Sequence, residues 1–151
     1  MGAMSANVGY STPLLHVADV GRSLRFYQAL GFEIVDVEGD ETPVWGRVHC
    51  EGGAIMFLLS EEPVDPAKQS VLLALYTPNL QELRERLLAD GLEPSTIRYP
   101  DYMPSGELQV SDPDGYVILI NHWSTAEHEP WEAGRKERLA RNGFVRPDSP
   151  E

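Results

Sequence analysis

The sequence repeats one pattern of predicted elements, and this repeat is the feature that most limits how the chain can fold. Residues 29–33 (ALGFE) align with residues 89–93 (ADGLE) at a shift of 60 positions. Near the end of each copy a glycine, Gly53 or Gly115, precedes an apolar run, at a shift of 62. Internal repetition means that each copy is one supersecondary unit. We therefore predict two similar modules.

Each copy predicts one strand, one helix and then three strands. In the first copy, Asp19 is a candidate N-cap and Gly31 a C-terminal stop, so a helix lies between them. Its expected strands are Ser11–Val17, Phe32–Val37, Val44–Cys50 and Ala54–Leu59. In the second copy, Thr77-Pro78 predicts a cap followed by proline at the first helical position, and Gly91 ends the helix. Its expected strands are Ser70–Tyr76, a weak strand around Ile97, Glu107–Val110 and Tyr116–Ile120.

The turn Asp112–Gly115 fixes the register of the last strand. Pro113 presets φ, Asp114 is expected to bond its own backbone, and Gly115 supplies a positive φ. The predicted fold class is α+β, with two βαβββ modules and a C-terminal helical extension.

The domain organisation follows from these elements. Thr125–Asn142 is predicted as a helix ending at Gly143, packed on the domain or on a partner subunit. The predicted segments form one compact domain: a disordered or tag-derived start at 1–10, the first module at 11–60, a linker at 61–69, the second module at 70–123, and a helix and tail at 124–151.

Composition limits the partners. The net charge of −12 argues against nucleic acid or an anionic membrane surface as a partner. Cys50 is the single cysteine, so no internal disulfide is possible, which fits a reducing compartment. No apolar run approaches the length of a membrane span, and no signal peptide is recognised, so we expect a cytoplasmic protein.

The motifs carry a family resemblance. Val17–Tyr27 with Leu30-Gly31-Phe32, and Asp112–Gly115, resemble the vicinal oxygen chelate superfamily of glyoxalases, bleomycin-resistance proteins and dioxygenases. The resemblance extends over roughly Thr12 to Asn121. It implies that the modules form a curved mixed-sheet cup and that two chains form a homodimer.

The resemblance also implies where metal-using members hold a divalent ion. The corresponding positions carry Thr12, Ser70, Leu119 and either Met56 or Leu58. Transition metals in such sites prefer imidazole or carboxylate ligands. We therefore predict that the family's metal site is absent, and that the protein uses no cofactor.

Side chains alternate between the two faces of a strand. The residues that share a face with these four positions are therefore expected to face the cup. The predicted ligand-binding residues are His16, Trp45, Arg47, His49, Met56, Tyr102, Glu107, Gln109, Leu119 and Asn121. Trp45 is a candidate stacking platform and Tyr102 a candidate lid. Arg47 is a candidate either for ligand recognition or for an ion pair with Glu107. His16 and His49 are either hydrogen-bonded strand residues or a displaced metal or base pair.

Three functions are compatible with this pattern. The first is a metal-free protein that sequesters an organic ligand, with a cationic or aromatic compound as the candidate, as antibiotic-resistance members of the bleomycin group do. The second is a glyoxalase-like lyase or isomerase, or a dioxygenase-like enzyme, with a divergent or absent metal site; proton transfer there falls to His49 or Glu107. The third is a structural or regulatory partner domain that uses Thr125–Asn142. No catalytic residue is assigned.

Overall fold

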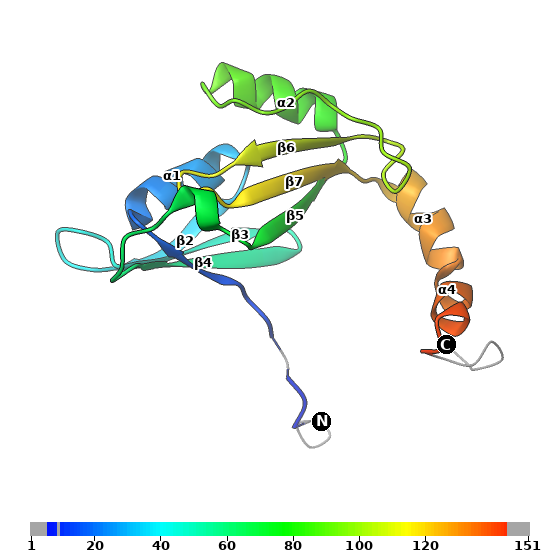
Figure 1. Cartoon of the computed structure of the whole chain (residues 1–151), viewed down its shortest axis with the longest axis horizontal. Coiled ribbons are helices and arrows are strands. Elements are labelled where there is room, and N and C mark those ends of the chain that lie inside the picture. Colours follow the sequence, from blue (N-terminus) through cyan, green and yellow to red (C-terminus); the bar gives the residue numbers. More distant parts are fainter. Residues whose placement is uncertain (1–5, 9, 145–151) are drawn as a thin grey trace. The chain divides into compact units, whose positions relative to one another are not determined.

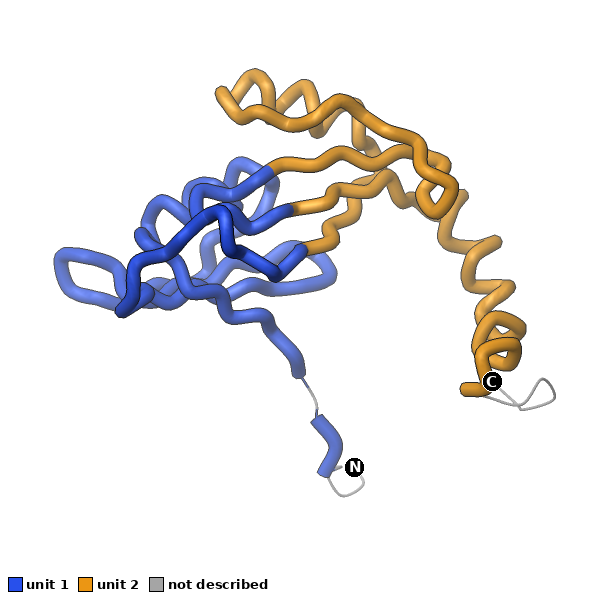
Figure 2. Tube along the Cα trace, in the orientation of Figure 1, with its two compact units in different colours: residues 1–72, 111–117 blue, residues 73–110, 118–151 orange. Residues whose placement is uncertain are grey.

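The computed structural model describes residues 6–8 and 10–144, and it divides into two compact units. Unit 1 comprises Met1–Leu72 with Ser111–Val117, and unit 2 comprises Leu73–Val110 with Ile118–Glu151 (Figure 2). Residues 1–5, 9 and 145–151 lie outside the described residues, so most of the predicted N-terminal segment and the end of the predicted tail are among them.

Unit 1 contains the first βαβββ module, and its predicted element order is confirmed (Figure 1). Its elements are β1 (Leu14–Val17), α1 (Val20–Ala29), β2 (Glu33–Glu38), β3 (Trp45–Cys50) and β4 (Gly53–Leu59), followed by the short 3-10 helix η1 (Pro66–Lys68). The strands form one sheet in the order β1-β4-β3-β2. β1 runs parallel to β4, and the other pairs are antiparallel.

Helix α1 covers one face of this sheet. Asp19 caps the helix by accepting a hydrogen bond from the Arg22 backbone N–H, as its sequence position predicts. Leu24 of α1 lies so close to Gly46 of β3 that a Cβ at Gly46 would come within 2.8 Å of Leu24 Cδ2. A side chain at position 46 would force Leu24 to shift, so glycine suits this close approach. Val48 is also buried on this side, so alternation directs the intervening β3 side chains to the opposite face.

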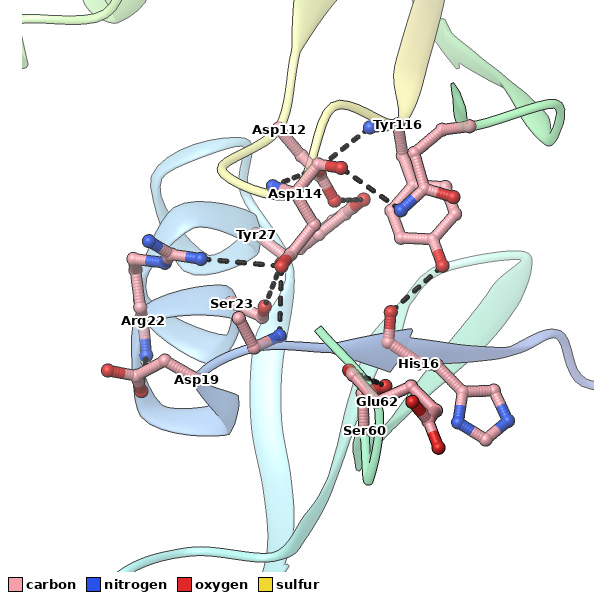
Figure 3. Close-up of polar contacts among 12 residues, drawn as sticks. His16, Asp19, Arg22, Ser23, Tyr27, Ser60, Glu62, Asp112, Asp114 and Tyr116 are labelled. Carbon is pink, nitrogen blue, oxygen red and sulfur yellow. Dashed lines mark hydrogen bonds and ion pairs between the residues drawn. The ribbon is translucent and has the colours of Figure 1, made fainter. Parts of the chain in front are cut away.

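The Asp112–Gly115 turn is tied to the start of α1 by Asp114 (Figure 3). This carboxylate is buried and accepts hydrogen bonds from the Ala18 backbone N–H at 2.9 Å and the Ser23 hydroxyl at 3.4 Å. It also pairs with Arg22, whose Nη2 lies 3.3 Å away. The turn motif therefore fixes the helix as well as the following strand.

Asp112, rather than Asp114, organises the turn backbone. Its Oδ1 accepts from the backbone N–H groups of Asp114 and Tyr116, which corrects the expectation that Asp114 bonds locally. The first acid of the turn takes this role because its side chain can reach the backbone N–H groups of the residues two and four positions after it. Its Oδ2 accepts from the Tyr27 hydroxyl at 2.9 Å. Burial, followed by the Asp112 carboxylate, raises the pKa of Tyr27, so the phenol remains a donor.

Unit 2 contains most of the second module and the C-terminal helices. Its elements, apart from one terminal residue of each strand that is assigned to unit 1, are β5 (Leu72–Thr77), α2 (Leu80–Ala89), β6 (Glu107–Ser111), β7 (Val117–His122), α3 (Thr125–Ala133) and α4 (Arg135–Arg141). The strand order is β5-β7-β6 (Figure 1). The N-cap of α2 is Asn79, which accepts from the Glu82 backbone N–H, and not the predicted Thr77. The mixed α+β fold class is confirmed by these elements.

The weak strand expected around Ile97 is reduced to a single antiparallel bridge between Arg98 and Glu107. Pro94 and Pro100 flank this segment, and proline cannot donate to a strand ladder. The second sheet therefore has three strands where the first has four.

The predicted helix over Thr125–Asn142 is two helices, α3 and α4, which meet at Gly134. Ser124 and Glu127 form a capping box at the start of α3. The ring of Trp131 in α3 lies edge-on to that of Trp123, 6.0 Å between centroids, and fixes α3 beside the end of β7. Within the described residues, no helix is long and apolar enough to cross a bilayer.

Candidate ligand-binding faces

The side of the unit 1 sheet opposite α1, which we call face 1, carries half of the predicted ligand residues. It consists of Leu14, His16, Trp45, Arg47, His49, Met56 and Leu58. The strand register arranges these side chains in rows. Arg47 lies opposite Met56, which lies opposite Leu14. Trp45 lies in the next row, with Leu58 and His16. This arrangement combines an aromatic ring, a cation and apolar side chains on one surface.

Arg47 is half-buried and is held by neutral groups. Its Nε donates to His49 Nε2 at 2.9 Å, and its Nη2 donates to Thr12 Oγ1 at 3.5 Å. Among the described residues, no carboxylate forms an ion pair with Arg47. Glu107, the partner that the sequence suggested, is paired with Arg98. The guanidinium therefore keeps donors available for a ligand.

Besides Glu33, which lies opposite His49, the edge strand β2 adds two further carboxylates to face 1, and the sequence analysis missed them. Asp36 lies opposite Arg47, and Glu38 lies opposite Trp45. Both are exposed. A register shift between Ile34 and Asp36 makes this possible, because it inserts Val35 as an extra residue. Strict alternation from Glu33 would have placed valines there, so no simple sequence signal revealed the two acids.

The family's metal positions do not suit a divalent cation in this chain. Thr12 accepts a hydrogen bond from the Arg47 guanidinium, which would repel a metal ion placed beside that hydroxyl. Leu119 and Met56 offer no imidazole or carboxylate. In the described part of the chain, no three His, Cys, Asp or Glu side chains form a group that could hold a metal ion.

The unit 2 sheet carries the other predicted strand residues, on a surface that we call face 2: Glu107, Gln109, Leu119 and Asn121. β6 and β7 are joined by a short turn and are therefore antiparallel. The His122 backbone N–H donates to the Gly106 carbonyl at 2.9 Å, so these two residues lie opposite each other. Glu107 is consequently opposite Asn121, and Gln109 is opposite Leu119.

Glu107 is a buried carboxylate, with a relative exposure of 1%. Its Oε1 accepts hydrogen bonds from Arg98 Nη2 at 2.9 Å and from the Tyr102 hydroxyl at 3.0 Å. The hydrogen bond to Glu107 raises the pKa of Tyr102. Tyr102 is itself 69% exposed, so its tip is anchored while the ring contacts solvent. Arg98 was not identified from the sequence, because its segment lacks a clear strand pattern.

Asn121 is buried beside Glu107, with a relative exposure of 4%. Its Nδ2 donates a long hydrogen bond of 3.5 Å to the Leu75 carbonyl. Its Oδ1 is buried, and no residue of the described chain donates to it. Buried polar atoms are nearly always satisfied, so an unpaired one calls for an explanation.

Comparison with known proteins identifies the family. The model of the Glyoxalase/Bleomycin resistance protein/Dioxygenase superfamily matches residues 10–120. The chain belongs to this superfamily. Among the curated proteins, none matches the sequence significantly. The superfamily match ends before α3, so the two C-terminal helices lie beyond it.

Solved structures share the superfamily fold. One is a bleomycin-binding protein complexed with bleomycin, with 18% identity, a TM-score of 0.63, and coverage of 78% of this chain and 100% of that chain. A bleomycin resistance determinant encoded on the transposon Tn5 has 20% identity, a TM-score of 0.61, and coverage of 76% and 97%. TnmS3, an antibiotic-binding protein from Streptomyces sp. CB03234, has 22% identity, a TM-score of 0.59, and coverage of 78% and 98%. At these identities the likeness establishes the fold.

Proposed function

We propose that this superfamily member is a small-molecule-binding protein that holds a planar organic cation on face 1 without a metal ion. The observation that carries the proposal is the position of Trp45. This half-buried indole has the apolar Leu58 on one side and the carboxylate of Glu38 on the other. A cation stacked on an indole gains about 0.5–2 kcal/mol, and a neighbouring carboxylate adds to the attraction.

Arg47 complements this platform. Its guanidinium lies one row away from Trp45 and lacks a carboxylate partner among the described residues. It is suited to a carbonyl or other acceptor on the same ligand. Two of the similar structures are a bleomycin-binding protein and an antibiotic-binding protein, which supports a binding role for this chain. The proposal extends to a homodimer in the cytoplasm.

The enzymatic alternative is less well supported by the geometry. A general base needs a free lone pair directed at its substrate. His49 Nε2 accepts from Arg47, and Glu107 Oε1 already accepts two hydrogen bonds. His49 is therefore not presented as an unoccupied base, and Glu107 is held through Oε1 and keeps only Oε2 without a donor among the described residues.

Titration with N-methylacridinium tests the proposal, with acridine at mildly alkaline pH as the uncharged analogue. We expect saturable quenching of tryptophan fluorescence, and tighter binding of the cation than of acridine. Trp45→Ala should weaken binding of the cation about tenfold, which corresponds to about 1.4 kcal/mol. Glu38→Gln should reduce the preference for the cation over acridine, because it removes the carboxylate opposite Trp45.

Trp131→Phe is the matched control, since this exposed tryptophan belongs to α3 and not to face 1. It should leave the affinity unchanged. Unchanged affinity in Trp45→Ala would overturn the proposal.

A further inference from the structure

We infer that face 2 contains a binding point for an ammonium or amidinium-type group, formed by Glu107 Oε2 and Asn121 Oδ1. This inference rests on the proposed small-molecule-binding function and names a polar group that the ligand must carry. It concerns side chains of unit 2 alone, so it does not depend on Trp45.

The strand register brings the two side chains together. Gly106 and His122 are joined by a backbone hydrogen bond, so Glu107 and Asn121 form the adjacent pair without backbone hydrogen bonds. Residues in such a pair have Cα atoms about 4.5 Å apart, and their side chains are the closest across an antiparallel ladder. Both side chains project from the same face of the hairpin.

Each side chain keeps one oxygen without a donor. On Glu107, Arg98 and Tyr102 both donate to Oε1, and no described residue donates to Oε2. On Asn121, the Leu75 carbonyl fixes the orientation of the amide, because it must face the NH₂ group and not the oxygen. Oδ1 is therefore the end that lacks a donor. Two acceptors without a donor among the described residues thus lie side by side, and the buried Asn121 Oδ1 requires one.

The negative charge of Glu107 makes the Glu107–Asn121 pair favour a cationic ligand group. The Glu107 side chain is 1% exposed, whereas that of its partner Arg98 is 55% exposed. Water screens an exposed guanidinium more strongly than it screens a buried carboxylate, so the site keeps a negative potential. A nitrogen group with several N–H bonds and a positive charge satisfies both acceptors, whereas a hydroxyl offers one donor.

Calorimetric titration with benzamidine tests the inference, with benzyl alcohol as an uncharged analogue. Glu107→Gln is the informative variant, because its amide oxygen can still accept from Arg98 and Tyr102 while its NH₂ replaces Oε2. We expect wild-type protein to prefer benzamidine, and Glu107→Gln to lower benzamidine affinity at least about tenfold. Glu93→Gln removes an exposed carboxylate of unit 2 and should leave the affinity unchanged.

The Asn121→Leu variant distinguishes a loss of ligand affinity from a loss of protein stability. It removes the unpaired oxygen, so it should lower benzamidine affinity while it raises the melting temperature. Equal affinity for benzamidine and benzyl alcohol, or benzamidine affinity that survives both substitutions, would overturn the inference. The proposed function fails separately, through unchanged N-methylacridinium binding in Trp45→Ala.

Discussion

Asp114 is the residue on which the start of α1 most depends. It is almost fully buried and accepts from a backbone N–H, a hydroxyl and a guanidinium. Asp114→Ala should destabilise the protein by about 3 kcal/mol, because it leaves the Ala18 N–H and the Ser23 hydroxyl without their acceptor. Urea denaturation monitored by circular dichroism measures this change.

Arg22→Ala is the control for that experiment. The Arg22 side chain is 45% exposed, and exposed ion pairs contribute less than about 1 kcal/mol. We expect the two variants to differ clearly in denaturation midpoint. Similar midpoints would show that the charge of Arg22, and not the hydrogen bonds to Ala18 and Ser23, gives Asp114 its importance.

The hydrogen-bond partners of individual side chains were the feature of this structure that the sequence predicted least well. The sequence correctly marked Asp112–Gly115 as a turn, but both aspartates suit local hydrogen bonds, and only the packed helix distinguishes their roles. Similarly, Asn121 could be assigned to a strand from its neighbours. Its unpaired oxygen depends on the position of the Leu75 carbonyl, which is far away in the sequence.

At the scale of elements, we expect the start of α3 to be sensitive to acid. Hydrogen bonds from the Ser124 hydroxyl and backbone lower the pKa of Glu127 from its ordinary 4.5 to about 2. The folded-state pKa is therefore depressed, so the stabilisation is complete above pH 4.5 and disappears as the pH falls towards 2. We expect amide exchange in the first turn of α3 to accelerate over that range.

Glu127→Gln is the control, because glutamine can still occupy a capping box but does not titrate. His122 lies near Glu127, with 3.7 Å between Nε2 and Oε1, so its own titration must be recorded in both proteins. If the variant and the wild type show the same acid-dependent exchange, another group controls the fraying of α3.

Element order was predictable because periodicity and caps act locally. The first module follows its predicted order of elements, with Asp19 as the helix cap. Two features differ from the predicted elements. The segment around Ile97 forms only a bridge, since prolines on both sides limit its pairing. The break at Gly134 also differs from the prediction, which extends one helix over Thr125–Asn142 to Gly143.

At the scale of the whole molecule, the proposed homodimer can be tested by light scattering coupled to size exclusion. We expect a mass of twice the 16.8 kDa chain. β1 and β5 each lie at one edge of their own sheet, and proteins rarely leave such edges open to solvent. Truncation after Ser124 should preserve the dimer if sheet edges form the interface.

A monomeric mass for the full chain would contradict the homodimer. A dimer lost on truncation would instead place the interface on α3 and α4. The net charge of −12 makes ionic strength a necessary variable, because self-repulsion at low salt opposes association.

The extra residue in β2 has a consequence for evolutionary comparison. Without Val35, the strand would alternate regularly and would still present Glu33, Asp36 and Glu38 on the same side. A relative one residue shorter at this point can therefore keep the same chemistry, whereas a gap-free alignment would pair its acids with valines. In this edge strand, homologous positions are better matched by their cross-strand neighbours than by counting along the chain.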